Sequence, residues 1–322
     1  MKRQSSIHPG FTARSGFTLL ELLIVIVIIG ILMALILPAI SGARRSAQIT
    51  SVAAEITQID QAITTFKGQY GVEPPSSLVI PAAGGTWGAA DRAKILAIWP
   101  QFNFTTNGGL GNTTAFSLSG AECLVFFLGG LESGSTSSAT LAGFSKNPAT
   151  PWTGGGGTRN GPYFEFDSGR IVDVDGDNLF EYLDRLPGQQ TPYLYLSSQG
   201  KSYKRVNTAG ADDFDVYSDA PATFAIPSSR NMSFAYLKSD GATPHRANSY
   251  QIISPGFDGA FGVGGVFNNG AELLNLDLNN DGDTSDLIDA DSDGVVEITD
   301  KIEPRGLEAD NIANFSNGRM KP

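Results

Sequence analysis

Cysteine and histidine are almost missing from this chain of 322 residues. A single cysteine, Cys123, excludes an internal disulfide framework and a zinc site built from cysteine thiolates. The chain has only two histidines, His8 and His245, so a histidine-based metal site or catalytic triad is a poor explanation for its function.

Charge is scarce as well, because Asp, Glu, Lys and Arg make up only 17% of the residues. The 33 acidic residues outnumber the 22 basic ones, which gives a formal net charge of -11. A nucleic acid backbone is bound by clustered Lys and Arg, so we expect no nucleic acid partner. Glycine (38) and proline (17) are plentiful, which indicates a turn-rich chain containing short strands.

The N-terminus combines a basic segment with a long apolar run. Residues 1–16 carry three basic side chains and no acid, and residues 22–37 are all apolar or glycine. Residues 17–40 would form a helix of about 36 Å, long enough to cross a membrane once. The basic segment would stay in the cytoplasm, and the bulk of the chain would be exported. A cleaved secretory signal is the simpler alternative, but it seldom tolerates an acid such as Glu21 at this place.

The segment Arg14-Ser-Gly-Phe-Thr-Leu-Leu-Glu21-Leu-Leu-Ile24 resembles the processing site of type IV prepilins and type II secretion pseudopilins. The resemblance implies that a prepilin peptidase cuts after Gly16 and that the new N-terminal Phe17 is N-methylated. It also implies that Glu21 pairs with the terminal amine of a neighbouring subunit, which gives a buried carboxylate its partner. Copies of itself, other pseudopilins and an inner-membrane assembly platform would then be the chain's partners.

A helical stripe continues beyond the apolar run. Its apolar residues are spaced alternately three and four apart, and they are Ile49, Val52, Ile56, Ile59, Ile63, Phe66 and Tyr70. Polar residues such as Glu55 and Asp60 fall off this stripe. We therefore expect a leader (1–16), a membrane and filament-core helix (17–40), its amphipathic continuation (41–71) and a globular head (72–322).

The predicted fold class is α+β: a long N-terminal helix whose C-terminal half packs on an antiparallel sheet in an enlarged, pilin-like head. Helices are expected at 91–99 and 121–128, with Cys123 facing the core, and strands at 163–166, 193–197 and 250–254. The turn Ser254-Pro-Gly-Phe-Asp-Gly259 resembles the one that opens the calcium loop of major, G-type pseudopilins. Nothing familiar appears in the region 87–159.

An acidic segment follows that turn, within a proposed calcium loop at residues 254–300. Thirteen acids but only two basic residues lie between residues 272 and 310. The acids alternate with other residues around a glycine, as they do in loops that bind Ca²⁺ through oxygen ligands. The alternative is an acidic loop that is only solvated. The candidate Ca²⁺ ligands are Asp289, Asp291, Asp293, Val295 (through its carbonyl), Glu297 and Asp300, and in a second, poorer site Asp277, Asn279, Asp281 and Asp283. A related pattern at Asp173-Val-Asp-Gly-Asp177 is better explained by a hairpin turn.

These patterns favour a structural subunit of a periplasmic type II secretion pseudopilus, held in the bacterial inner membrane until it assembles. The alternative is a minor type IV pilin or adhesin with a calcium-dependent, ligand-binding head, which would expose an aromatic cluster such as Phe257, Phe261 and Phe267. A membrane-tethered enzyme is the third possibility. We expect no catalytic and no organic-cofactor residues, because neither a nucleophile elbow nor an isolated carboxylate pair is recognisable.

Overall fold

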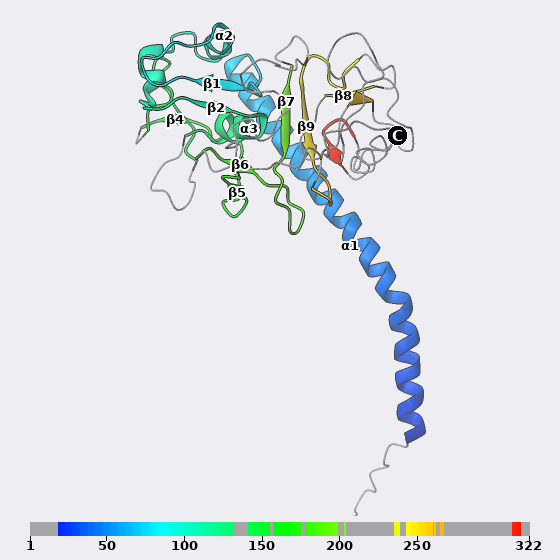
Figure 1. The fold of residues 1–322 in the computed structure, drawn as a ribbon. Helices are drawn as coiled ribbons and strands as arrows, with labels where there is room; N and C mark the ends of the chain where they lie inside the picture. The colour runs from blue at the N-terminus through cyan, green and yellow to red at the C-terminus, as the bar shows by residue number, and fades with distance from the viewer. Residues whose placement is uncertain are drawn as a thin grey trace, which may run out of the picture. The chain divides into compact units, whose positions relative to one another are not determined.

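The computed structural model describes residues 19–131, 141–154, 157–174, 178–198, 203, 235–238, 243–259, 261, 265–266 and 311–316. The chain divides into two compact units, residues 1–47 and residues 48–322 (Figure 1). We use "head" for the part of the second unit that follows the first helix.

Helix α1 runs from Leu19 to Tyr70, as the sequence predicts, so it begins in the first unit and ends in the second. The helix stops at Gly71, whose φ of 81° lies in the left-handed region that favours glycine. The Gly71 amide donates to the Lys67 carbonyl oxygen at 2.8 Å, which closes the last turn. A glycine just past the helix end is therefore the reason that the helix stops here.

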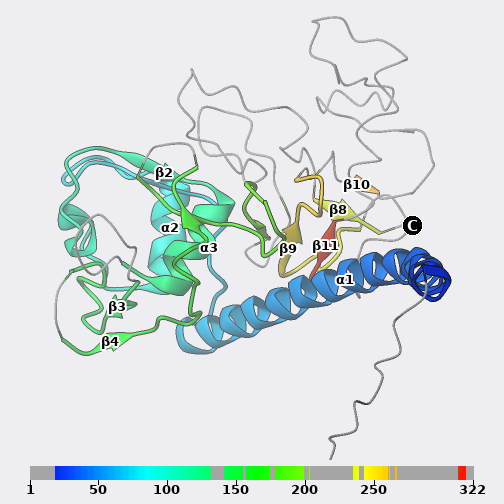
Figure 2. The ribbon, with the colours of Figure 1, turned by 90° about the horizontal axis from the view of Figure 1, so that it is seen from below.

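Among the described residues, the largest sheet has three antiparallel strands in the order β11-β9-β7, namely β11 (Ile312–Ala313), β9 (Tyr250–Ser254) and β7 (Leu194–Ser197). Leu194 pairs with Ile253, and Ile312 pairs with Ser254. Strand β9 and strand β11 lie beside the part of α1 that belongs to the second unit (Figures 1 and 2). The predicted strands at 193–197 and 250–254 are thus confirmed.

The remaining described strands form two-stranded pairs. Three of them are antiparallel: β1 (Leu78–Ile80) with β2 (Phe116–Leu118), β3 (Phe144–Ser145) with β4 (Arg159–Asn160), and β5 (Ile171–Val172) with β6 (Glu181–Tyr182). The fourth pair, β8 (Tyr236–Leu237) with β10 (Gly265–Val266), is parallel. The antiparallel pairing of β5 with β6 confirms the hairpin predicted around Asp173; residues 175–177 of its turn lie outside the described residues.

The described part of the head contains two short α-helices, α2 (Ala89–Ile98) and α3 (Gly120–Gly129). Helix α3 begins with a capping box, in which the Ser119 hydroxyl accepts from the Glu122 amide and the Glu122 carboxylate accepts from the Ser119 amide. Cys123 on this helix is fully buried, as predicted. The chain is therefore α+β, with the long helix leading, as its sequence predicts.

The region 87–159, which resembles nothing familiar in sequence, is organised around stacked aromatic rings. The rings of Trp99 and Trp152 lie edge to face with centroids 5.8 Å apart, and Phe102 packs against Trp152 at 4.7 Å. The 3₁₀ segment η1 (Phe104–Gly109) holds Asn107, whose side chain accepts a hydrogen bond from the Trp87 indole. Because these rings are buried, the region is part of the core of the head.

One predicted strand, at Tyr163–Phe166, is wrong, because the structure has no strand there. The amides of Tyr163 and Phe164 both donate to the Leu128 carbonyl oxygen at the end of α3, so they make no strand ladder. Of the aromatic side chains that suggested a strand, Phe164 and Phe166 pack on Tyr182, whose ring centroid lies 4.8 Å from that of Phe166. Tyr163 instead packs on Phe66 of α1, with ring centroids 5.3 Å apart.

Candidate functional site

The part of α1 in the first unit presents a long run of exposed apolar side chains. Every large apolar side chain described from Leu19 to Ile40 is exposed, with exposed fractions from 42% to 87%. Among the described residues, α1 is the one helix long and apolar enough to cross a membrane. Such a surface is unstable in water, so it needs lipid or other apolar helices around it.

Glu21 lies in the first turn of α1, at the start of this apolar surface. A carboxylate is favourable at this end of a helix, where the backbone amide groups leave a partial positive charge. The processing residues Gly16 and Phe17 lie outside the described residues. The structure therefore places Glu21 at the N-terminal end of the helix but does not describe the cleavage site.

The continuation of α1 in the second unit packs on the head through its apolar stripe. Val52, Ile56, Ile59, Ile63 and Phe66 are at most 2% exposed, which confirms the predicted packing. At about 1.5–3 kcal/mol for each fully buried large apolar side chain, this contact contributes much of the stability with which the helix packs on the head.

A buried ion pair fixes the same part of the helix. Glu55, which the stripe placed on a polar face, is only 4% exposed and pairs with Arg170 of the head. The Arg170 guanidinium donates to Glu55 Oε2 at 2.8 Å and also to Glu55 Oε1. Burial alone would lower the pKa of Arg170, but the Glu55 carboxylate outweighs it and raises that pKa. The more exposed Arg185 also approaches Glu55 Oε1, at 4.0 Å, so the buried carboxylate of the helix is paired with basic side chains of the head.

Two tyrosines complete the hydrogen bonds of Glu55. The Tyr193 hydroxyl donates to Oε2 at 2.7 Å, and the Tyr182 hydroxyl donates to Oε1 at 3.1 Å. Burial, and then the charges of nearby carboxylates, raise the pKa of Tyr193 well above its ordinary value, and Tyr182 shifts in the same direction. Both phenols therefore stay neutral and can keep donating to the carboxylate.

A second carboxylate, Asp184, lies beside this pair and contacts the turn that begins at Ser254. Asp184 Oδ2 is hydrogen-bonded to the Ser254 hydroxyl, and Asp184 Oδ1 accepts from the Leu186 amide at 3.1 Å. In the turn, the Gly256 amide donates to the Ser254 hydroxyl oxygen at 3.2 Å. Asp184 therefore connects the neighbourhood of α1 to the first residues of the predicted calcium loop.

The C-terminal strand is also attached to α1. Arg246 donates to Asp60 Oδ1 at 2.9 Å and to the Asn314 carbonyl oxygen at 2.9 Å. The Tyr250 hydroxyl donates to the Asp60 carbonyl oxygen at 3.2 Å. Asp60, which is off the apolar stripe, thus links the helix to strand β9 and to the end of strand β11.

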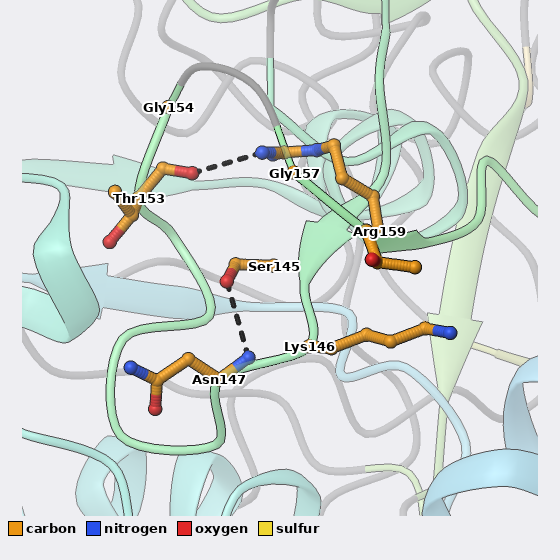
Figure 3. A pocket seen from close by; sticks show the side chains of 8 residues that line it. Ser145, Lys146, Asn147, Thr153, Gly154, Gly157 and Arg159 are labelled. Atoms are coloured by element: carbon orange, nitrogen blue, oxygen red, sulfur yellow. Dashed lines mark hydrogen bonds between the residues drawn. The ribbon is translucent and has the colours of Figure 1, made fainter.

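The pocket shown in Figure 3 lies between β3, β4 and the glycine-rich loop before β4, and has a volume of about 230 Å³. One of its two basic side chains already binds the backbone: Arg159 donates to the carbonyl oxygens of Ala142, Gly143 and Thr153. The Ser145 hydroxyl oxygen accepts from the Asn147 amide at 3.2 Å. Arg159 thus binds the Thr153 carbonyl oxygen from the other end of the loop.

The predicted metal ligands, residues 277–300, all lie outside the described residues. Within the described part of the chain, no group of three or more His, Cys, Asp or Glu side chains could hold a metal ion. Of the aromatic cluster expected for an adhesin, Phe261 is fully buried, Phe257 packs partly buried against the core, and Phe267 lies outside the described residues. The Phe261 side chain is therefore not available to a ligand.

Sequence reasoning missed the cluster formed by Glu55, Arg170, Tyr182, Tyr193 and Asp184. One local signal was available for Glu55, which lies between the apolar positions Val52 and Ile56. If the buried face of the helix is slightly wider than the apolar stripe, it includes Glu55. Its partners come from segments more than a hundred residues away, so no spacing rule connects them.

Comparison with known proteins locates a match only at the N-terminus. No curated protein and no solved structure matches the chain. Residues 11–37 match the family described as the prokaryotic N-terminal methylation motif. This stretch contains Gly16, Phe17 and Glu21 together with most of the exposed apolar surface of α1. The chain therefore carries the N-terminal methylation motif that is typical of type IV pilins and pseudopilins.

Proposed function

We propose that the chain is a pseudopilin, a structural subunit of a type II secretion pseudopilus rather than an enzyme. The observation that carries this proposal is the coincidence of the methylation motif with a helix whose described apolar side chains are exposed. Prepilin peptidase would remove residues 1–16, and methylated Phe17 would become the N-terminus. The subunit would wait in the bacterial inner membrane with its head in the periplasm.

Assembly would bring copies of the apolar helix, and those of other pseudopilins, together on the inner-membrane assembly platform. Apolar helices give little specificity of position along their length, because one apolar contact resembles the next. A carboxylate in that environment is costly unless it meets a cation, so Glu21 would select the position where the terminal amine of a neighbour lies close. The filament that grows from the membrane would drive protein export.

The processing step is tested by mass spectrometry of the chain isolated from membranes. We expect a chain that begins with N-methylated Phe17, and a chain that retains residues 1–16 would refute the proposal. The assembly step is tested with Glu21→Gln. This variant should enter the membrane normally but fail to form filaments in cells that express the assembly platform.

Glu165→Gln is the matched control, since it makes the same chemical change at an exposed position of the head. It should assemble as the unmodified chain does. Normal filaments from Glu21→Gln would remove the proposed role of the charge. Export of secreted proteins into the medium, compared with fibres on the cell surface, distinguishes a secretion pseudopilus from a type IV pilus.

We also propose that Ca²⁺ binds the acidic segment. The donor set at Asp289, Asp291, Asp293, Glu297 and Asp300 consists of oxygen ligands, which suit Ca²⁺ better than a transition metal. Calcium should raise the unfolding temperature of the full chain, and EGTA should reverse the increase. Asp291→Ala should reduce this response. An unfolding temperature independent of calcium would support a solvated acidic loop instead.

A further inference from the structure

The environment of Asp184 contains an unusual arrangement of proton donors. Its carboxyl is 2% exposed, and its Oδ1 lies 3.4 Å from the Tyr193 hydroxyl oxygen. That hydroxyl has one proton, and the closer acceptor is Glu55 Oε2 at 2.7 Å. The tyrosine oxygen therefore presents lone pairs to Asp184. Two oxygens facing each other in this way repel unless Asp184 supplies a proton between them.

The charges around Asp184 favour the same protonation state. Glu55 approaches from α1, Tyr193 from the position just before β7, Ser254 from the end of β9, and Arg185 follows directly in the chain. The Arg170 guanidinium is bound to Glu55. Among the described residues, no basic side chain forms an ion pair with Asp184. Both guanidinium groups near these two carboxylates, the mostly buried Arg170 and the half-exposed Arg185, form ion pairs with Glu55. Burial is the largest cause that raises the pKa of Asp184, to about 6.

We propose that Asp184 is a proton-binding site that couples the docking of α1 to the turn at Ser254. With a proton, the Asp184 carboxyl connects the Tyr193 oxygen to the Ser254 hydroxyl in one continuous chain of hydrogen bonds. Without it, the contact with Tyr193 becomes repulsive, and a net negative charge remains between the helix and the head.

The turn that begins at Ser254 is hydrogen-bonded to the segment that follows Asp184. Ser254 is the first residue of this turn, and its hydroxyl oxygen accepts a hydrogen bond from the Gly256 amide. The Gln189 side chain donates through Nε2 to the Gly256 carbonyl oxygen at 2.8 Å. Thr191 Oγ1 donates to the Gly259 carbonyl oxygen at 2.8 Å. The segment that bears Gln189 and Thr191 begins five residues after Asp184, so a change at the carboxyl reaches both sides of the turn.

The direction of the effect follows from linkage. An acid whose pKa is higher in the folded state than in the unfolded state adds stability that is complete below the ordinary value of 3.8. This stability is lost as the pH rises through about 6. A difference of about two pH units in the pKa of one group corresponds to a change of roughly 100-fold in the unfolding equilibrium constant.

The test compares the full chain with its Asp184→Asn variant, both in detergent micelles, by denaturant unfolding between about pH 4 and about pH 8. Asparagine is neutral at every pH, so the two proteins should be equally stable at the acid end. Above pH 6 the variant should have the smaller unfolding equilibrium constant, by up to roughly 100-fold. A ratio that does not change with pH would overturn the proposal.

Glu55→Gln is the contrasting variant, because it weakens the helix contact but leaves the Asp184 carboxyl in place. Glu55→Gln should be less stable than the unmodified chain at every pH. The ratio of its unfolding equilibrium constant to that of the double variant Glu55→Gln/Asp184→Asn should still change with pH. Should Asp184→Asn fail to fold, the infrared band of a protonated carboxyl in the unmodified chain provides the answer. That band should be lost as the pH rises through about 6 and should change frequency in Ser254→Ala. The absence of a titrating carboxyl band would refute the proposal.

Discussion

Arg170 and Glu55, which are 115 residues apart in the sequence, form a buried ion pair between the head and helix α1. Removing one partner would leave a buried charge without compensation. We therefore expect Glu55→Ala or Arg170→Ala to destabilise the head by about 3–5 kcal/mol. The measurement is denaturant unfolding in micelles, and the double variant should lose clearly less than the sum of the two single variants. Additive losses would mean that the two side chains act independently.

The pair of Arg246 with Asp60 should behave differently, because these side chains are 34% and 28% exposed. Exposed ion pairs contribute about 0.2–1 kcal/mol and are screened by salt. Asp60→Asn should therefore cost about 1 kcal/mol or less in dilute buffer and less still in about 1 M NaCl. Glu55→Gln supplies the comparison, since its loss should change little with salt. If Asp60→Asn lowered the free energy of unfolding by a large amount that did not depend on salt, this pair would be shielded from water despite its exposed surface.

The two parts of α1 should respond differently to the same substitution. Ile63 is fully buried against the head, so Ile63→Ala should destabilise the head by about 2–5 kcal/mol through lost packing and a cavity. Ile31 is 58% exposed, so Ile31→Ala should leave the unfolding of the head unchanged. Instead, we expect Ile31→Ala to weaken filament assembly. Equal effects of the two changes on the head would contradict the division of the chain into two units.

Gly120 and Gly68 provide a matched pair of helical glycines. A Cβ at Gly120 would lie less than 3.0 Å from the Tyr195 carbonyl oxygen, whereas a Cβ at Gly68 would meet nothing within 4 Å. Alanine normally stabilises a helix by about 1 kcal/mol relative to glycine. Gly68→Ala should show that gain, and Gly120→Ala should instead destabilise, because α3 must move away from strand β7. Unfolding temperatures of the two variants decide the question, and a gain at Gly120 would contradict the close approach.

The sequence was sufficient for the parts of the fold that follow local rules. Helix α1 and its buried stripe follow from apolar spacing, and strand β9 follows from a short β-branched and aromatic run. The burial of Cys123 also follows from its apolar neighbours. These features depend on residues close in sequence, so their signals are strong.

What could not be predicted depends on contacts between distant segments. Glu55 looked like a surface residue because its partners Arg170 and Tyr193 are far away in the sequence. The aromatic residues at Tyr163–Phe166 resemble a strand, but the carbonyl oxygen of Leu128 takes two of their amides. Tertiary packing overrides local propensity at both places. The acidic ligands and the cleavage site, which the sequence marks most clearly, lie outside the described residues.

The pairing of β11 with β9 has a consequence for biosynthesis. Residues 312–313 supply the last strand of the main sheet, and they are made long after residues 250–254. Until they arrive, one side of β9 exposes backbone groups that any extended peptide could bind. A chain truncated before Asn311 would keep that unpaired edge permanently and should aggregate. The main sheet can therefore gain its third described strand only after residues 312–313 have been synthesised.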